Sequence, residues 1–371
     1  MTRHRCALIK AALALAVGGV ALSVATAASS ARAATIIDVK SNAAANRLVS
    51  TQQPNGSWTG DPDYADYQGP IVCGLSNAAE NSTNSSDAAA YKTAATDGAN
   101  YILANSSPNF LGDELCALMC VSSLQPNPNS NPYHTAALNY YNNTIGGTPN
   151  GTTNYINNLV AQYTGAFNEQ SQAVIYLAYH TIASDEANAT DKAIWRQKLI
   201  DTLGSVDDSD YYPTGALGAS VWALAQTGNG LDSTTITGSS SVLNGKKLSD
   251  LPAMLANQMV ASGPDANTFY YDFGHTADGY TEDAAFALLG LEEANQKLGL
   301  GYASMILAGE TELTASVDAS GGTYLDMTQT APTYNVYAGR FLQAVPEPSS
   351  VALIFMSLAG IAARRRRARS A

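Results

Sequence analysis

The chain has 371 residues, of which 13% are charged, and its 31 acidic residues outnumber its 19 Lys and Arg residues to give a net charge of −12. An acidic surface of this kind repels nucleic acids and anionic lipids, so no nucleic-acid partner is expected. The length is large for one simple core, but folds built from repeated units reach it in a single domain.

The first 33 residues have the three parts of a secretory signal peptide. Basic residues precede an apolar run over residues 11–24, and Ala31-Arg32-Ala33 offers a cleavage site before residue 34. Ala25-Thr26-Ala27 is the alternative site. A true membrane helix would need a longer apolar run, so we expect residues 1–33 to be removed on export.

Helical periodicity fills residues 34–344, whereas strand signals are sparse. Amphipathic helices, with one apolar stripe each, are predicted over residues 37–51, 87–104, 132–141, 155–163, 192–203, 248–260 and 302–317. Helices that are apolar on nearly every side alternate with them, over residues 69–80, 114–124, 170–182, 214–226, 282–298 and 334–343. A one-striped helix belongs on a surface and an all-apolar helix belongs inside. The alternation predicts an all-α fold, an α/α toroid of about six helical hairpins. An α-solenoid is the competing arrangement, and the uneven repeat lengths argue against it.

A Gln-x2-Gly-x-Trp pattern follows the first predicted helix, at Gln53, Gly56 and Trp58. It resembles the QW motif of the terpenoid cyclase and prenyltransferase superfamily of α/α toroids. The resemblance implies that Gln53 caps the outer helix and that Trp58 packs over the next turn, which would tie neighbouring repeats together. The plainer alternative is a glycine turn with a packed Trp.

A degenerate copy of the same pattern has Asp318, Gly322 and Tyr324. The activities of the superfamily are not implied. The acidic motif of class II cyclases would need an Asp where Tyr211 stands, and no Cys lies near His275 in sequence to complete a prenyltransferase zinc site. The resemblance therefore implies the fold alone. No metal site is predicted, and no pattern names a cofactor.

Acidic residues and one histidine lie just before or at the starts of the predicted inner helices. Parallel inner helices would bring these starts to one mouth of the ring, where their dipoles add positive potential. We therefore expect a group of candidate catalytic residues there: Asp113, Glu114, Glu169, Asp210, His275, Glu282 and Asp283. Each acid could instead simply cap a helix N-terminus, and the histidine could be structural.

Paired carboxylates hydrolyse glycosidic bonds when they stand about 5–5.5 Å apart (retaining) or about 6.5–9.5 Å apart (inverting). Lyase chemistry would instead require His275 or a tyrosine beside a basic group, and Arg340 is the basic residue near the end of the sixth inner helix. Two functions therefore stay open. One is a noncatalytic protein that binds a glycan or another extracellular ligand, and the other is a polysaccharide-active lyase or hydrolase.

Three cysteines remain once Cys6 leaves with the signal peptide. At most one disulfide can form among Cys73, Cys116 and Cys120. Cys116 and Cys120 are one helical turn apart and point along their helix, so Cys73 with Cys116 is the favoured pair if their helices are neighbours. Three buried small residues without a disulfide are the plainer expectation.

The chain ends at residues 345–371 in three parts: Val345-Pro346-Glu347-Pro348, an apolar run over residues 351–363, and Arg364-Arg365-Arg366-Arg367. The run is short for a permanent membrane helix, which needs about 20 residues. This order resembles the PEP-CTERM sorting signal of Gram-negative bacteria. An ordinary short C-terminal anchor is the alternative.

The sorting resemblance implies export to the cell envelope or the medium. It also implies transient anchoring in the inner membrane with the arginines on the cytoplasmic side, and cleavage near Pro346 to Pro348 by an exosortase-type transpeptidase. Such signals are associated with exopolysaccharide producers, so an extracellular polysaccharide is the expected partner. Without both terminal segments the body keeps 10 basic and 30 acidic residues, a net charge near −20.

Overall fold

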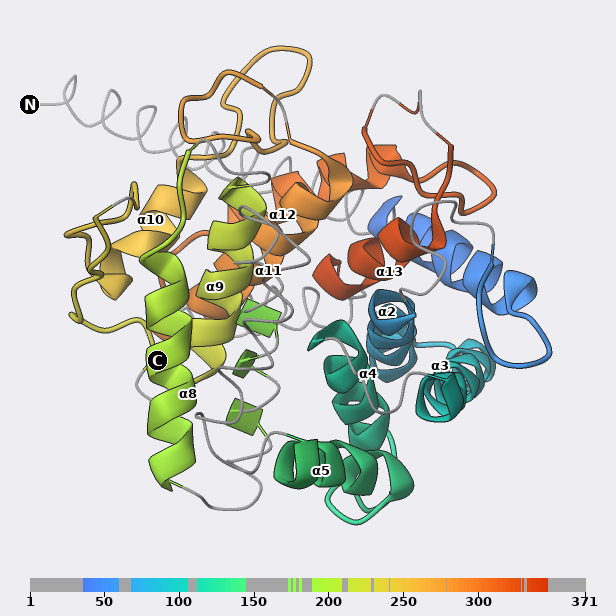
Figure 1. The fold of residues 1–371 in the computed structure, drawn as a ribbon. Coiled ribbons are helices and arrows are strands. Elements are labelled where there is room, and N and C mark those ends of the chain that lie inside the picture. The colour runs from blue at the N-terminus through green and yellow to red at the C-terminus, as the bar shows by residue number, and fades with distance from the viewer. Residues whose placement is uncertain are drawn as a thin grey trace, which may run out of the picture.

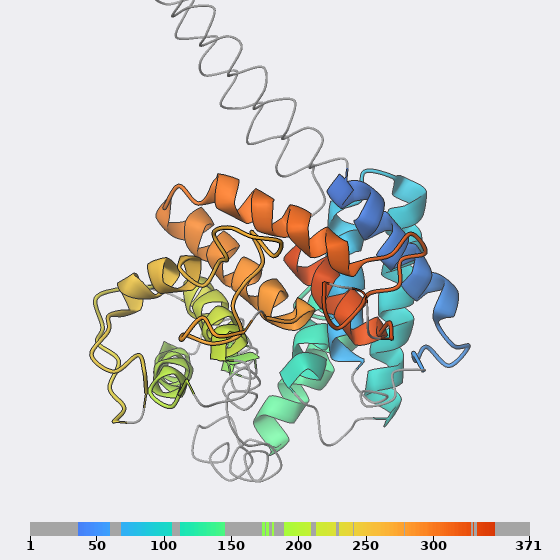
Figure 2. The same cartoon turned by 90° about the horizontal axis from the view of Figure 1, so that it is seen from above.

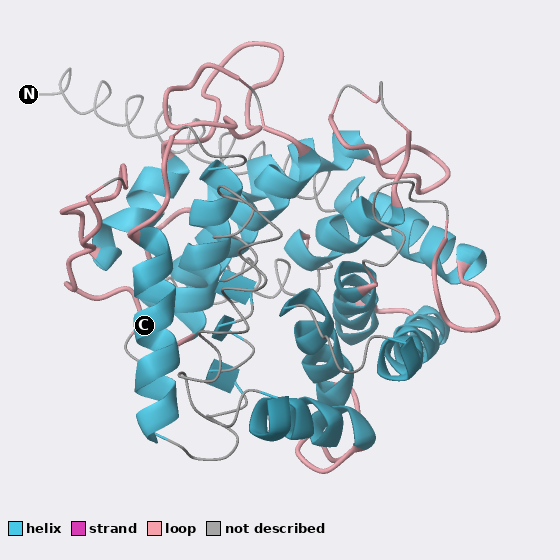
Figure 3. Ribbon diagram, in the orientation of Figure 1, coloured by secondary structure: helices cyan, strands magenta, loops and turns pink. Residues whose placement is uncertain are grey.

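The computed structural model describes residues 36–59, 68–105, 112–144, 189–208, 213–227, 230–239, 241–277, 279–327, 329 and 332–345, together with residues 173–174, 176–177 and 180–181. The predicted signal peptide, the helix expected at 155–163 and the tail after Val345 lie outside these residues. The described part is all-α, as predicted: it contains helices and isolated β-bridges but no strand (Figures 1 and 3).

A first helix spans residues 36–51. The helices that follow are α2 (Gly69–Asn81), α3 (Ser85–Asn105), α4 (Gly112–Ser123), α5 (Pro132–Thr144), α8 (Ala189–Leu203), α9 (Pro213–Gln226), α10 (Leu251–Ala256), α11 (Thr281–Leu298), α12 (Ala303–Leu313) and α13 (Asn335–Ala344). Most of these bounds lie within a few residues of the predicted ones.

The helix predicted over residues 248–260 is shorter than expected. A 3-10 turn at Leu248–Asp250 leads into α10, with Pro252 in its first turn, and α10 ends at Ala256. The chain then folds back on itself, because the Val260 amide donates to the Thr268 carbonyl at 2.9 Å. The amphipathic pattern extends to Val260, but the helix ends at Ala256 and Met259 forms a β-bridge with Phe269 instead.

Burial separates the helices into the two predicted kinds. Twelve of the 14 residues of α9 are buried. In α3 the buried residues form one stripe: Tyr91, Ala94, Ala95, Gly98, Ala99 and Ile102. The spacing of three and four residues in α3 is that of a surface helix with one face on the core.

The inner helices contact one another in the order α9, α11, α13, α2 and α4 (Figure 1). Helices α8, α12, α3 and α5 pack on α9, α11, α2 and α4 respectively. Figure 2 shows α11 and α12 side by side in orange. Four of the five inner helices thus pack against a second helix that is close to them in sequence.

The first halves of the inner helices are in backbone contact. A Cβ added to Gly74 of α2 would lie 2.4 Å from the carbonyl oxygen of Gly339 in α13. A Cβ added to Gly218 of α9 would lie 2.6 Å from the carbonyl oxygen of Phe286 in α11. Because real Cβ atoms cannot approach so closely, these positions need glycine, and the helices leave no space between them there.

The loop at residues 52–58 docks the first helix onto α3. The Trp58 indole donates to the Leu48 carbonyl at 2.7 Å, and Gly56, with φ of 89°, lies against the Asp97 carbonyl. The side chain that crosses to α3 is Gln52, whose amide donates to the Ala94 carbonyl at 2.9 Å. The Gln53 side chain is exposed, and its amide donates to the Thr51 carbonyl at the end of the first helix at 3.3 Å. The local pattern located the turn, but it did not indicate that Gln52 makes the contact with α3.

The loop after α12 repeats this geometry. The Asp318 amide donates to the Gly322 carbonyl at 2.9 Å, as the Gln53 amide does to the Ser57 carbonyl at 2.8 Å. Gly321, with φ of 84°, is therefore the equivalent of Gly56, and it lies against the Ala43 carbonyl of the first helix. The degenerate motif was predicted one residue out of register, because two adjacent glycines fit the pattern.

Candidate functional site

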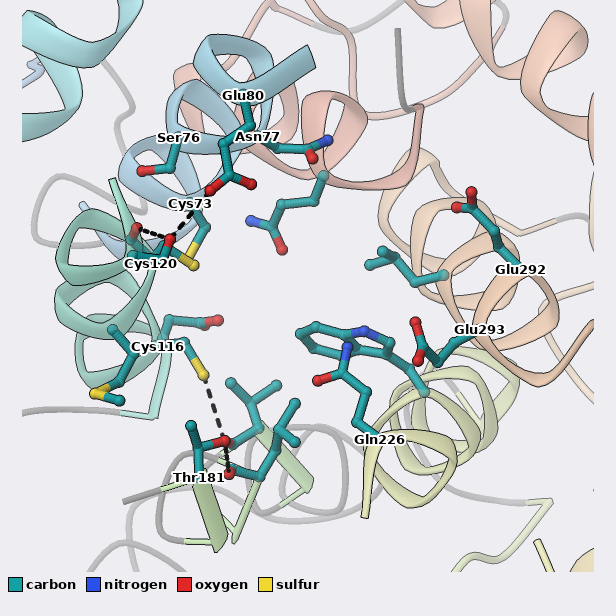
Figure 4. A pocket seen from close by; sticks show the side chains of 18 of the residues that line it. Cys73, Ser76, Asn77, Glu80, Cys116, Cys120, Thr181, Gln226, Glu292 and Glu293 are labelled. Carbon is teal, nitrogen blue, oxygen red and sulfur yellow. Dashed lines mark hydrogen bonds between the residues drawn. The ribbon is translucent and has the colours of Figure 1, made fainter. Parts of the chain in front are cut away.

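A cavity of about 410 Å³ lies among the inner helices (Figure 4). Helices α2, α4, α9, α11 and α13 each contribute side chains to it, and so do Val174, Leu177 and Thr181. Its volume is within the usual range for small-molecule sites. The cavity is therefore the candidate binding site of the described part of the chain.

The cavity is built mainly from the second halves of the inner helices. Its exposed lining residues stand at or near the C-terminal ends of α2, α4, α9 and α11: Glu80, Ser123, Gln226 and Gln296. The sequence had placed the candidate site at the N-terminal ends. Those ends are packed together by glycine contacts, so the helices have room to separate only further along.

The polar part of the lining is acidic and amide-rich. Glu80, Glu292 and Gln226 face the cavity in Figure 4, together with Asn77. Burial, and next the charge of Glu293, raise the pKa of Glu292 to about 7. Among the described lining residues there is no Lys, Arg or His. Helix C-termini carry partial negative charge, so both the side chains and the backbone favour a cation or a hydrogen-bond donor here.

The apolar part of the lining includes Trp222, Leu289 and Met119. Trp222 is half-buried, whereas Trp58 and Trp195 are buried elsewhere in the core. A half-buried indole beside amides and carboxylates provides both a stacking surface and hydrogen-bonding groups. Glu293 also lines the cavity and pairs with Lys297 at 3.4 Å on the exposed side of α11.

Three thiols form one wall of the cavity, opposite Glu292 and Glu293 (Figure 4). The Sγ atoms of Cys73 and Cys120 are 3.2 Å apart, and Cys116 donates to the Val174 carbonyl at 3.6 Å. The neighbour of Cys73 is thus Cys120. The sequence had instead favoured Cys116 as its partner. All three are free thiols in this structure. The hydrogen bond from Cys120, together with burial, raises the pKa of Cys73 well above its usual range.

A buried ion cluster joins three inner helices beside the cavity. Arg340 of α13 donates from Nη1 and Nη2 to the two carboxylate oxygens of Asp113, at 2.9 and 2.8 Å. Its Nε donates to Glu282 Oε1 at 2.9 Å, and its guanidinium lies over the Phe286 ring at 4.5 Å. Burial raises the pKa of Glu282 despite the opposing charge of Arg340. Burial lowers the pKa of Arg340, but the two carboxylates outweigh this effect and raise it above its usual value.

The structure brings two of the seven predicted site residues together, Asp113 and Glu282, on this guanidinium. Of the predicted residues it describes, Asp113 alone also lines the cavity. Glu114 is buried in the first turn of α4. Asp283 accepts a hydrogen bond from the Tyr280 amide at 2.9 Å, the capping geometry that was the alternative. Burial raises the pKa of Asp283 well above its usual range.

His275 lies apart from this cluster, in the loop before α11. It is exposed, has φ of 57°, and stacks on Tyr270 with ring centres 4.2 Å apart. Glu169 and Asp210 are outside the described residues. Among the residues that are described, no group of His, Cys, Asp and Glu is arranged to hold a metal ion.

The acids and amides at the mouth of the cavity lie near helix ends, whereas the predicted site residues lie at helix starts. A signal for them exists in the sequence. Otherwise apolar helices become polar in their last two turns, at Asn77 and Glu80, at Gln226, and at Glu292 and Glu293. Polar residues on the inner side of an apolar helix indicate a cavity or solvent at that level.

Residues 344–367 match the PEP-CTERM protein-sorting motif. No curated protein matches the chain. The match confirms the sorting signal predicted from Val345 to Arg367 and indicates an exported protein with a C-terminal sorting tail that an exosortase-type enzyme processes. Within the described residues, no helix has both the length and the apolarity to cross a membrane.

Proposed function

We propose that this exported protein binds a glycan in its central cavity, with a preference for sugars that carry an amino group over sugars that carry an acid. The observation that carries the proposal is the composition of the cavity mouth. It has carboxylates and amides at helix C-termini, and no basic group among the described lining residues. An extracellular polysaccharide is then the ligand or its source.

The helix packing supports an α/α toroid as the scaffold for this site. Five inner helices contact one another in the order α9, α11, α13, α2 and α4, four of them pack against an outer helix, and all five line one cavity together with Val174, Leu177 and Thr181. The two loops at Gly56 and Gly321 dock consecutive outer helices in the same way. A closed ring of about six hairpins accounts for all these contacts.

Sugar recognition follows from the chemistry of the lining. The Gln226 amide can donate hydrogen bonds to sugar hydroxyl groups and accept hydrogen bonds from them, and the Glu292 carboxylate can accept hydrogen bonds from hydroxyl and amino groups. The half-buried Trp222 offers an apolar face to a sugar ring. An amino group would also keep Glu292 ionised, because a nearby positive charge favours the carboxylate.

Fluorescence titration of the exported protein tests this function. Trp222 is the one tryptophan at the cavity, so its emission should change when oligosaccharides of glucosamine, glucose or glucuronic acid are added. The glucosamine oligomer should bind most tightly and the glucuronic acid oligomer least. Glu292→Gln should weaken glucosamine binding by roughly 10-fold or more, since charged hydrogen bonds contribute about 1.5–3 kcal/mol.

Glu312→Gln is the matched control, because Glu312 lies on α12 and does not line the cavity. It should leave the affinities unchanged. Tightest binding of the uronic acid oligomer, or no response to any of the three, would overturn the proposed function.

Glycoside hydrolysis is the second candidate, and the pKa of Glu292 favours it. A carboxyl with a pKa of about 7 next to another glutamate is the arrangement that supplies a general acid and a carboxylate at neutral pH. Reducing-end release from the same oligosaccharides, abolished by Glu292→Gln, would establish it. The roles predicted for Asp113 and Glu282 are less favoured, because Arg340 occupies their hydrogen-bonding oxygens.

The sorting tail completes the proposal. Residues 351–363 would hold the chain in the inner membrane until an exosortase-type enzyme cuts near Pro346 to Pro348. The acidic body would then be released to the cell envelope or the medium, where its net charge near −20 keeps it soluble.

A further inference from the structure

Two cysteines from different helices meet at the cavity wall. Cys73 is in the middle of α2 and Cys120 is near the end of α4, and their Sγ atoms are 3.2 Å apart. Forming a disulfide requires the two sulfurs to approach to about 2.05 Å, a movement of roughly 1 Å. The α2 and α4 backbones already pack against each other, so rotation of the side chains can supply much of this movement.

We propose that Cys73 and Cys120 form a disulfide in the exported protein and that Cys116 remains the free thiol of the cavity. The sorting motif places the mature chain outside the cytoplasm, where disulfides form and persist. Because the proposal rests on the geometry of the two thiols and on export, it does not depend on which ligand the cavity binds.

Cys116 is the weaker partner for either sulfur. It is one helical turn before Cys120 on α4, so a bond between these two would run along a single helix. Its own Sγ points to the Val174 carbonyl, which belongs to a different element of the wall. Figure 4 shows Cys116 lower on the wall than Cys73 and Cys120.

The oxidation needs a disulfide donor, either a protein disulfide or a small-molecule one. The Sγ of Cys120, which is half-buried, attacks the donor and forms a mixed disulfide, and one donor sulfur leaves as a thiol. Cys73, which is buried, then attacks Cys120 Sγ and releases the second donor thiol. The two cysteines together lose two protons and two electrons, and the donor disulfide gains both as it becomes two thiols.

Packing controls when this reaction can occur. The thiolate is the attacking species, and burial together with the contact between the two sulfurs disfavours it at Cys73. The folded, reduced protein should therefore react slowly at neutral pH, and a disulfide acquired during export should persist. Once formed, the bond would link α2 to α4 at the wall of the cavity and fix the distance between these helices.

Thiol counting on the exported, processed protein tests the proposal. Under denaturing conditions without reductant, a maleimide should label one cysteine, and after reduction it should label three. Trypsin cuts after Lys92 and separates Cys73 from the other two cysteines. A non-reduced digest should therefore contain a linked pair of peptides that separates on reduction.

Two single variants identify the partner of Cys73. Cys116→Ser should keep the linked peptides and leave no labelled thiol, whereas Cys120→Ser should lose the link. Labelling of all three thiols in the unreduced wild-type protein overturns the proposal. So does a link that survives Cys120→Ser and disappears in Cys116→Ser. If a variant fails to fold, the wild-type protein still identifies the partner, because fragmentation of the maleimide-labelled tryptic peptide places the label on Cys116, as proposed, or on Cys120, which would overturn the proposal.

Discussion

Arg340 and Asp113 form a two-point ion pair across the inner helices, 227 positions apart in sequence, with N–O distances of 2.9 and 2.8 Å. The guanidinium side chain is 5% exposed and that of Asp113 is 16% exposed. Glu282 accepts from the remaining edge of the same guanidinium. A single buried cation therefore joins the last inner helix to the starts of α4 and α11.

Removal of that cation should be strongly destabilising. Arg340→Met would leave the Asp113 and Glu282 carboxylates buried without their partner, and breaking a buried pair typically costs about 3–5 kcal/mol. Urea denaturation of the processed protein should show a loss of that size. Adding Asp113→Asn and Glu282→Gln to Arg340→Met should restore much of it, because neutral amides need no counter-charge.

Lys297→Met is the matched control for that experiment. Lys297 pairs with Glu293 four residues earlier on the exposed side of α11, at 3.4 Å. Exposed pairs of this spacing contribute about 0.3–0.5 kcal/mol. Equal losses in Arg340→Met and Lys297→Met would mean that the cluster does not hold the inner helices together.

Gly321→Ala should destabilise the protein more than an ordinary positive-φ glycine substitution. The residue has φ of 84°, and an added Cβ would lie 2.1 Å from the Ala43 carbonyl oxygen. Gly245 has a similar φ of 79° with no atom within 4 Å of an added Cβ, so it isolates the backbone strain. We expect about 1–2 kcal/mol for Gly245→Ala and more than about 3 kcal/mol for Gly321→Ala in the same denaturation assay. Similar losses would show that the loop does not dock on the first helix.

Stability should fall as pH rises from about 4.5 to about 8 because of Glu310. This side chain is 2% exposed, and burial, assisted by the charge of Glu292, raises its pKa from 4.5 to about 8. The native state holds the proton more tightly than the unfolded chain, so the contribution of Glu310 to stability is greatest below about pH 4.5 and is lost as the pH rises to about 8.

Glu310→Gln should flatten this profile, because the amide stays neutral at every pH. The gain in unfolding free energy at pH 8 should be on the order of a few kcal/mol. Denaturation series at several pH values measure it, with Glu80→Gln, an exposed glutamate, as the control. A profile that keeps its slope in Glu310→Gln would assign the pH dependence to other groups.

The sorting tail should be absent from the processed protein. Intact-mass analysis of the exported form should give a chain that ends near Pro346 to Pro348 and lacks Arg364 to Arg367. Replacing both prolines by alanine should leave an uncut, membrane-associated form. Detection of the arginines on the mature surface protein would contradict processing at this motif.

Local sequence determined the helices and the sorting signal. The spacing of apolar residues fixes which face of a segment is buried, and this needs only neighbours within a few turns, so the bounds of α2, α9 and α11 were predicted within a few residues. The sorting tail is likewise a continuous pattern, and it was recognised without a fold. The glycine turn at Gly56 was found for the same reason.

Only the tertiary structure decided which end of the helices forms the cavity, which glutamine crosses to α3, and which thiol meets Cys73. Gly74 and Gly339 are 265 positions apart, yet their contact fixes where α2 and α13 touch and therefore where space remains. The partners of Arg340 are set by the same packing. Periodicity assigns a residue to a face of its own helix, but the distance from that face to another helix depends on contacts that no local pattern contains.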